Sequence, residues 1–219
     1  MEGNHFKMKR LVILVEGDSE LVFVNKFLSP YLVSQGLNIS INAQKIITNN
    51  KLQQKGGNVS YQYLKNDIIR IESQGNVVIT TLLDFFRIPT DFPGHNITDC
   101  DCIEQAMHLD FDSNPNYIPY IQKYEFETLL FASIAGFEFL LDDTGQIDEI
   151  QRIISSYNNP EDINGGVTTS PSNRLKRIFP YNKVNDSELI CTEVSIETMC
   201  SRCPRFNDWI NRLLIHNYN

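Results

Sequence analysis

The first half of the chain alternates between short, continuous apolar runs and stretches whose apolar residues recur at helical spacing. Leu-Val-Ile-Leu-Val at 11–15 is one such run, and the largely apolar stretch at 76–84 ends in an aspartate. Continuous apolar runs of this length are typical of strands that are buried on both faces of a parallel sheet. The pattern predicts strands at 11–15, 39–47, 76–84 and 117–121.

The stretches between these runs predict helices. One begins after Ser19, a suitable N-cap residue, and others begin near Tyr61 and Ile103. Glycine, proline and asparagine predict irregular segments at 49–58 and 87–95. A helix start is predicted at 125–131, and after Gly136 the pattern predicts short helices at 147–156, 172–179 and 206–214.

Strands that alternate with helices predict an α/β fold, in which a mostly parallel sheet is flanked by helices and followed by a helical C-terminal part. We expect residues 1–135 to form the α/β core and residues 136–219 to form a helical extension packed on it. In such sheets, ligands bind at the carboxyl ends of the strands.

The composition is that of an ordinary globular protein, with 42% hydrophobic and 21% charged residues among 219. No apolar run approaches the roughly 20 residues that cross a bilayer, and the N-terminus lacks the features of a secretory signal. We therefore expect a cytoplasmic protein that does not bind membranes. In that compartment, five cysteines favour free thiols over disulfides, and their spacing gives little support for a zinc site.

The net charge of −8 limits the kinds of partner. A protein that binds nucleic acid mainly through its phosphates normally presents a basic surface, so a pure DNA-binding module is disfavoured. A metal-dependent enzyme is affected less, because bound divalent cations neutralise carboxylates and attract phosphate.

Two carboxylates stand at the ends of predicted buried strands, Glu16 after 11–15 and Asp84 at the end of 76–84. If these strands are neighbours, the two acids share one edge of the sheet and repel each other unless they share a proton or a cation. Mg²⁺ prefers such oxygen ligands. Gly17 would let a substrate approach the backbone closely, and Glu20 adds an acid within one helical turn.

The structural alternative is that these acids only support local turns. Glu16 and Glu20 would then stabilise the N-terminus of the helix that follows, and Asp84 would cap a turn. The two strand ends taken together favour a metal site over this alternative.

Two segments resemble the motifs of Toprim domains, the fold of topoisomerases, primases and overcoming-lysogenization-defect (OLD) nucleases. Val-Glu-Gly-Asp-Ser-Glu at 15–20 resembles their strand–Glu–Gly entry. Leu-Leu-Asp-Phe-Phe at 82–86 is similar to their Asp-x-Asp strand end, with Phe86 in place of the second aspartate. The resemblance implies a Toprim/Rossmann-like sheet.

The rest of the chain resembles a bacterial Toprim-like family of unknown function, which is related to OLD nucleases and often encoded beside ABC-type ATPases in phage-defence islands. Tyr124 stands where relatives usually have a histidine. The matching segments follow in order along nearly the whole chain: 91–94, 124–131, 160–164, 170–175, 181–183 and 203–209.

The resemblance also implies roles for particular residues. In Toprim nucleases the glutamate acts as general acid or base or as a metal ligand, and the aspartates hold Mg²⁺. Carried over, Glu16 takes the first role and Asp84 the second. Because Phe86 cannot bind a metal, a replacement carboxylate is needed, for which Glu125 is the first candidate and Glu20 the next.

The spacing of Glu125 and Glu127 divides their roles, since residues two apart point to different faces of a helix. We expect one of them to serve the site and the other to cap a helix or pair with a base. The basic residues Arg174, Lys176 and Lys183 could bind phosphates of the substrate or form a solvated helix face.

These observations together lead to the hypothesis of a metal-dependent nuclease. Mg²⁺ or Mn²⁺ would be held by Glu16, Asp84 and Glu125, Glu16 or Glu20 would manage the proton, and Gly17, Arg174, Lys176 and Lys183 would contact the substrate. The expected partners are nucleic acid (DNA or RNA) and an ABC-type ATPase, with a homo-oligomer left open.

Two alternatives from other classes stay open. One is a non-catalytic Toprim-like module that docks onto or regulates an ATPase, and Phe86 is the feature that supports it. The other is an enzyme for small phosphate esters, which would suit an acidic protein.

Overall fold

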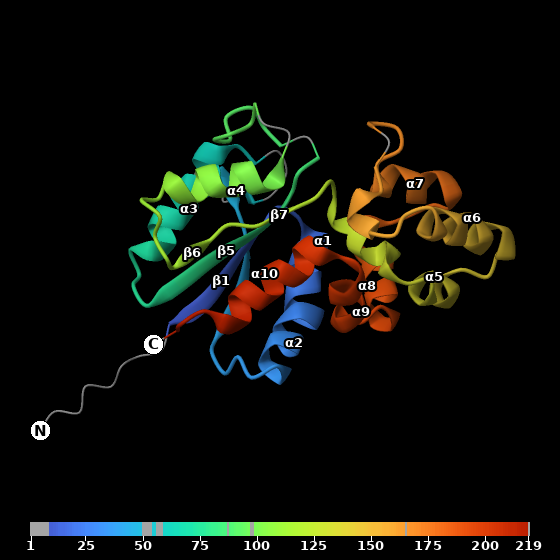
Figure 1. Cartoon of the computed structure of the whole chain (residues 1–219), viewed down its shortest axis with the longest axis horizontal. Coiled ribbons are helices and arrows are strands. Elements are labelled where there is room, and N and C mark those ends of the chain that lie inside the picture. The colour runs from blue at the N-terminus through green and yellow to red at the C-terminus, as the bar shows by residue number, and fades with distance from the viewer. Residues whose placement is uncertain are drawn as a thin grey trace, which may run out of the picture.

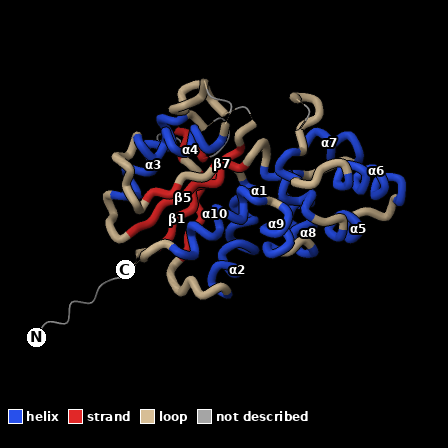
Figure 2. The backbone as a smooth tube through the Cα atoms, viewed as in Figure 1, coloured by secondary structure: helices blue, strands red, loops and turns tan. Residues whose placement is uncertain are grey.

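The computed structural model describes residues 9–49, 54–55, 59–86, 88–96, 99–164 and 166–218. A sheet with helices on both faces forms one half of the molecule, and a group of short helices forms the other (Figure 1). Figure 2 shows the labelled strands gathered in the first half, while the second half consists of helices and loops. The predicted α/β fold with a helical C-terminal part is confirmed.

The central sheet has the strand order β2–β1–β5–β6, and each pairing is parallel. β1 (Arg10–Val15) and β5 (Val77–Asp84) lie at its centre, and β2 (Ile41–Lys45) lies at one edge. At the other edge, β6 (Tyr117–Ile118) and β7 (Ile121–Gln122) pair with successive parts of β5. Since these pairings are all parallel, the carboxyl ends of the strands point to one side.

β1 is buried on both faces, as its continuous apolar sequence predicts. Leu11, Ile13 and Val15 belong to one hydrophobic core, and Val12 and Leu14 belong to another. This division follows from strand geometry, because successive side chains point to opposite faces of a sheet.

Each face of the sheet is covered by its own helices (Figure 1). The core on one side is closed by α3 (Tyr61–Glu72) and α4 (Cys100–Leu109). The core on the other side is closed by elements from both ends of the chain, namely α1 (Asp18–Phe23), the π-helical turn η1 (Val24–Leu28), α2 (Ser29–Ser34) and α10 (Pro204–Ile215).

The remaining helices lie beyond the carboxyl edge of the sheet (Figure 1). The 3₁₀ helix η2 (Phe126–Ala132) connects them to the sheet. They are α5 (Ala135–Leu140), α6 (Thr144–Ser155), the 3₁₀ turn η3 (Pro160–Asp162), α7 (Pro171–Ile178), α8 (Lys183–Glu193) and α9 (Ile196–Arg202).

The last helix returns to the sheet and joins the two parts. Trp209 on α10 stacks on Tyr120 with ring centroids 4.4 Å apart, and its Nε1 donates a hydrogen bond to Thr80 Oγ1 at 2.8 Å. One hydrophobic core contains residues from Leu11 to Tyr218. The α/β part and the helical part therefore share a core.

The structure differs from the predicted elements in a few places. The strand predicted at 117–121 is interrupted at Pro119, which has no N–H to donate. There the Thr81 hydroxyl accepts a hydrogen bond from Tyr120 N and donates one to Tyr120 O, each at 2.8 Å. The helix predicted after Ser19 begins two residues earlier in the chain, with Gly17 as its N-cap.

Part of the segment 49–58, predicted to be irregular, is strand. β3 (Ile47–Asn49) pairs in antiparallel fashion with β4 (Gln54–Lys55), and the rest of the segment lies outside the described residues. Helices α5, α8 and α9 are additional to those predicted. Within the described ranges, no helix is both long enough and apolar enough to cross a membrane.

Trp209 tests whether α10 packs on the sheet as described. Trp209→Ala removes the stack on Tyr120 and the hydrogen bond to Thr80, so we expect the free energy of unfolding to fall by about 3–5 kcal/mol. The matched change Phe139→Ala, at a side chain that is 60% exposed, should cost less than about 1 kcal/mol. Urea unfolding followed by circular dichroism measures both, and an unchanged Trp209→Ala midpoint would contradict the packing.

Candidate functional site

Glu16 and Asp84 come to the same edge of the sheet. β1 and β5 are adjacent parallel strands, with Val15 opposite Leu82. Glu16 follows the last residue of β1, and Asp84 is the last residue of β5. The two strands are therefore neighbours, as the hypothesis of a shared site requires, and their ends lie where ligands of parallel sheets bind.

Two further carboxylates and one lysine gather around Asp84. Glu20 lies in the first turn of α1, Glu127 lies in η2, and Lys183 is the first residue of α8. Lys183 Nζ is 3.2 Å from Glu20 Oε1, 3.6 Å from Asp84 Oδ2 and 3.6 Å from Glu127 Oε2. Together with Glu16, we call these residues the acidic cluster.

Hydrogen bonds at the ends of elements position the cluster. Phe126 N donates to Asp84 Oδ1 at 2.7 Å, which joins the start of η2 to the end of β5. The Asn182 side chain caps α8 by accepting from Asn185 N at 3.0 Å, so Lys183 is fixed at the first helical position.

Gly17 is part of the same arrangement. A Cβ at Gly17 would lie 2.6 Å from Glu20 Oε2, closer than real Cβ contacts allow. The glycine therefore leaves room for the Glu20 carboxylate in this structure. Its predicted role in substrate contact stays a prediction.

Two carboxylates of the cluster, Glu20 and Glu127, are buried and incompletely paired. Glu20 is 2% exposed and Glu127 is 0% exposed. Within the part of the chain that the structure describes, Glu20 Oε2 and both Glu127 oxygens lack a hydrogen-bond partner. Buried carboxylates without hydrogen bonds are costly, so these atoms are suited to a further ligand.

Burial shifts the titration of these acids. It raises the pKa of Glu16 to about 7, with a further increase from Glu20 and a smaller opposing effect of Lys183. Burial likewise raises the pKa of Asp84 and of Glu127, and Lys183 opposes both shifts. The cluster therefore contains acids that can take up or release a proton near neutral pH.

Lys183 keeps its charge at this position. Burial by itself lowers its pKa, but the attraction of Asp84, Glu127 and Glu20 outweighs that effect and raises the pKa above its ordinary value. The side chain is 39% exposed, so the ammonium faces both the buried carboxylates and solvent.

The donor atoms fit a hard divalent cation. Carboxylate oxygens are the ligands that Mg²⁺ prefers, and Glu16, Glu20, Asp84 and Glu127 supply them from one side of the sheet. Their arrangement is not that of a preformed metal centre, since the described ranges contain no group of three His, Cys, Asp or Glu side chains with metal-binding geometry. The Lys183 ammonium lies between three of the carboxylates.

Glu125 and Glu127 divide their roles. Glu125 accepts hydrogen bonds from Ser172 N at 2.8 Å and Ser172 Oγ at 2.9 Å, and so binds the first turn of α7. Glu127 points into the acidic cluster. The structure thus brings Glu127 to Asp84 and holds the Glu125 carboxylate on Ser172; the expected role of Glu125 as a metal ligand stays a prediction.

The other basic candidates lie apart from the lysine of the cluster. Arg174 Nε donates to Thr169 O at 2.7 Å, within the segment that leads into α7. Lys176 is exposed on α7. Lys183 is the one of the three that the structure brings to the acidic cluster.

The sequence favours Glu125 over Glu127 as the additional metal ligand. The Glu-Phe-Glu spacing does predict that one of the two acids serves the site and that the other lies elsewhere. What the sequence could not show is that Glu125 lies before the helix, in extended backbone with φ −138° and ψ 155°. The first helical acid is therefore Glu127.

Comparison with known proteins gives one family and one solved structure. Residues 15–214 match the family described as "Domain of unknown function (DUF4276)". The chain is also similar to the C-terminal region of the Burkholderia pseudomallei OLD protein, at 16% sequence identity and a TM-score of 0.45, over 95% of this chain and 100% of that one. These values are too low to transfer a function. No curated protein matches the chain.

The raised pKa values predict how stability depends on pH. Between the ordinary carboxyl pKa of 4.5 and about 7, the folded state holds protons on Glu16 and Glu127 that the unfolded state has lost. The free energy of unfolding of the metal-free protein should therefore fall as pH rises through that window. Thermal unfolding measured at several pH values tests this dependence.

Glu127→Gln tests how much the acidic cluster contributes to the pH dependence of stability. Removing this buried charge should raise the free energy of unfolding at about pH 7.5 by roughly 1–3 kcal/mol and flatten its pH dependence. Glu149→Gln is the matched control, because Glu149 is half-exposed and pairs with Arg177 on the surface. A Glu127→Gln variant less stable than the wild type at that pH would show that the carboxylate is a net stabilising partner of Lys183.

Proposed function

The chain belongs to the DUF4276 family, and we propose that it is a metal-dependent phosphodiesterase that cuts nucleic acid. The observation that carries the proposal is the acidic cluster at the carboxyl edge of the sheet. Its buried carboxylate oxygens without hydrogen bonds cost stability that Lys183 only partly offsets, and such a cost is typical of a functional site.

Within the cluster, Asp84, Glu127 and Glu16 are the ligands we assign to Mg²⁺ or Mn²⁺. The first two are buried or nearly so, and neither Glu127 oxygen has a hydrogen-bond partner in the described residues, although Oε2 lies 3.6 Å from Lys183 Nζ. When bound, the ion would polarise a phosphate and lower the pKa of an attacking water. Glu127 supplies the additional carboxylate that Phe86 cannot, which weakens the case for a non-catalytic module.

Glu16 and Glu20 are the candidates for moving the proton. A general acid or base works best with a pKa near the operating pH, and burial raises that of Glu16 to about 7. Glu20 holds Lys183 through its Oε1 at 3.2 Å. The ammonium would offset the negative charge that develops on the phosphate in the transition state.

The wider setting is part of the same proposal and has its support in the sequence resemblance. An acidic protein needs help to retain a polyanion, which an ABC-type ATPase partner or self-association would give. Phage defence follows from the same resemblance, and the expected cytoplasmic location stays part of the proposal. Arg174 and Lys176 are proposed as more distant phosphate contacts.

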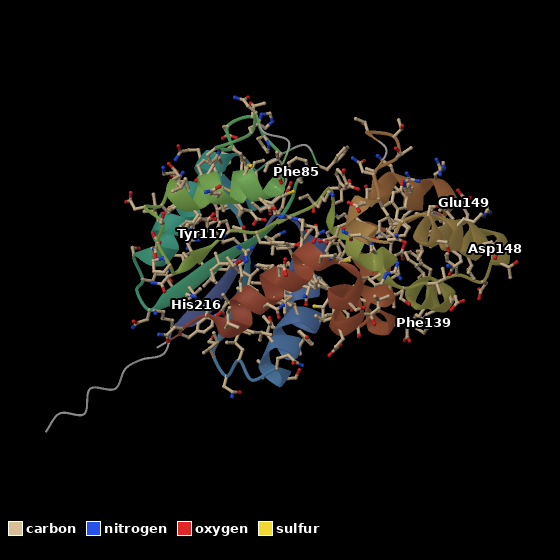
Figure 3. The ribbon with its side chains drawn as sticks, in the orientation of Figure 1. Phe85, Tyr117, Phe139, Asp148, Glu149 and His216 are labelled. Atoms are coloured by element: carbon tan, nitrogen blue, oxygen red, sulfur yellow. The ribbon has the colours of Figure 1, made fainter. Side chains whose placement is uncertain are left out.

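The direct test is cleavage of end-labelled oligonucleotides with Mg²⁺ or Mn²⁺ and with EDTA. Wild type should cut only when the metal is present, and Asp84→Asn should lower the rate about 100-fold or more, because it removes a ligand charge. Asp148→Asn is the matched control, since Asp148 is exposed on α6, far from the cluster (Figure 3).

Lys183→Met gives a second readout. If the ammonium acts in the transition state, kcat should fall roughly 100-fold while KM changes little.

Wild-type protein that cuts no polynucleotide with either metal, alone or with its ATPase partner, would refute the nuclease proposal and favour the docking module. Hydrolysis of mononucleotide esters alone would favour the small-ester enzyme.

A further inference from the structure

A cavity lies next to the carboxyl end of β5, apart from the acidic cluster. It has a volume of about 520 Å³, within the range of small-molecule sites. Its lining includes Phe85, Tyr124, Lys123, Arg205 and Asp99. None of these residues belongs to the acidic cluster.

The cavity begins one residue away from Asp84. β5 ends at Asp84, whose carboxylate lies 3.6 Å from Lys183 Nζ, and the next residue, Phe85, packs against the core that α3 and α4 close. Phe86 N donates to Tyr124 O at 2.7 Å, which ties the two walls of the cavity together. Figure 3 labels Phe85 beside the carboxyl end of the sheet.

Two aromatic rings form one part of the lining. The ring centroids of Phe85 and Tyr124 lie 6.5 Å apart at 61°, and Lys123 Nζ lies 5.6 Å from the centroid of the Tyr124 ring. The Phe85 and Tyr124 side chains are partly exposed. Such rings offer stacking and edge contacts to a flat, polarizable ligand.

Tyr124 has a left-handed backbone, with φ at 65°. This conformation is unfavourable for an aromatic residue and favours glycine or asparagine. Strained residues persist where the surrounding structure holds them, and they cluster at ligand sites. The strain thus gives an independent reason to look for a ligand beside Tyr124.

The polar lining carries both donors and acceptors. Arg205 pairs through Nη1 with Asp101 and through Nη2 with Glu104, so its guanidinium is already engaged. Asp99 and Asp101 stand at the start of α4, and both are exposed at the rim. Lys123 pairs with Asp162 and is 33% exposed, so its ammonium keeps further protons to donate.

We propose that this cavity holds one unpaired nucleobase of a single-stranded or locally unpaired nucleic acid. A base combines a flat π-face for Phe85 and Tyr124 with edges that donate to Asp99 and accept from Lys123. Stacking on aromatic rings adds affinity beyond the phosphate contacts, which suits a chain with net charge −8. The inference rests on the proposed function, because the backbone of that nucleotide then lies beside Asp84.

Fluorescence of 2-aminopurine tests the cavity without cleavage. The probe is a short single strand, DNA or RNA, with one 2-aminopurine, in a buffer with Ca²⁺ in place of Mg²⁺. Wild type should quench the fluorescence of the single strand and not of the same strand annealed to its complement. The monophosphate of 2-aminopurine riboside alone should bind at least tenfold more weakly, because the strand adds contacts.

Variants of the two rings sharpen the test. Tyr124→Leu and Phe85→Leu should each weaken binding about tenfold, while Tyr124→Phe should retain it. Tyr124→Gly guards against misfolding, because glycine accepts the left-handed backbone and still removes the ring. Phe139→Leu is the control, at an exposed ring on α5 (Figure 3).

Duplex that binds as tightly as single strand, or leucine variants that bind as wild type does, would overturn the inference. So would a free nucleotide that binds as tightly as the strand. Quenching by a protein that cuts nothing with Mg²⁺ or Mn²⁺ would refute only the proposed function. Metal-dependent cleavage of single strand and duplex alike, without quenching, would refute only the cavity.

Discussion

The contact between the Lys183 ammonium and three carboxylates is the interaction on which the candidate site depends. Glu20, Asp84 and Glu127 come from three different elements and lie close enough to repel one another. Burying one charged carboxylate costs several kcal/mol, and only a well-placed opposite charge offsets that cost. Because Lys183 is on α8, the helical part contributes the cation that lets the sheet edge remain acidic.

Much of the fold could be predicted because its signals are local. β1 is apolar from Leu11 to Val15 and β5 is largely apolar, and acids stand at their carboxyl ends, so the position of Glu16 and Asp84 follows from parallel pairing. Helices α5, α8 and α9 lack such a signal. α8, for example, buries Ser187 and Cys191 beside Ile190, and its sequence shows no clear apolar stripe.

The site could be predicted less completely, because its composition depends on tertiary contacts. Whether Glu125 or Glu127 faces Asp84 is decided by where η2 begins, and that point is set by the hydrogen bond from Phe126 N to Asp84. Lys183 is placed by the cap of a helix that lies a hundred residues after β5. Tyr124, in the wall of the cavity, has a positive φ. A sequence predicts such a conformation at glycine or asparagine, and gives no sign of it at a tyrosine.

The break at Pro119 has a consequence for association between chains. An edge strand with free N–H and C=O groups is a template on which another polypeptide can add a strand. Here the outer edge of the sheet consists of two strands of two residues each, β6 and β7, separated by Pro119 and Tyr120. Ile121 N donates to Glu104 Oε1, and the carbonyls of Pro119 and Ile121 accept from Arg212 and Arg205. This edge therefore offers little backbone for aggregation by strand addition, although the sheet itself is open.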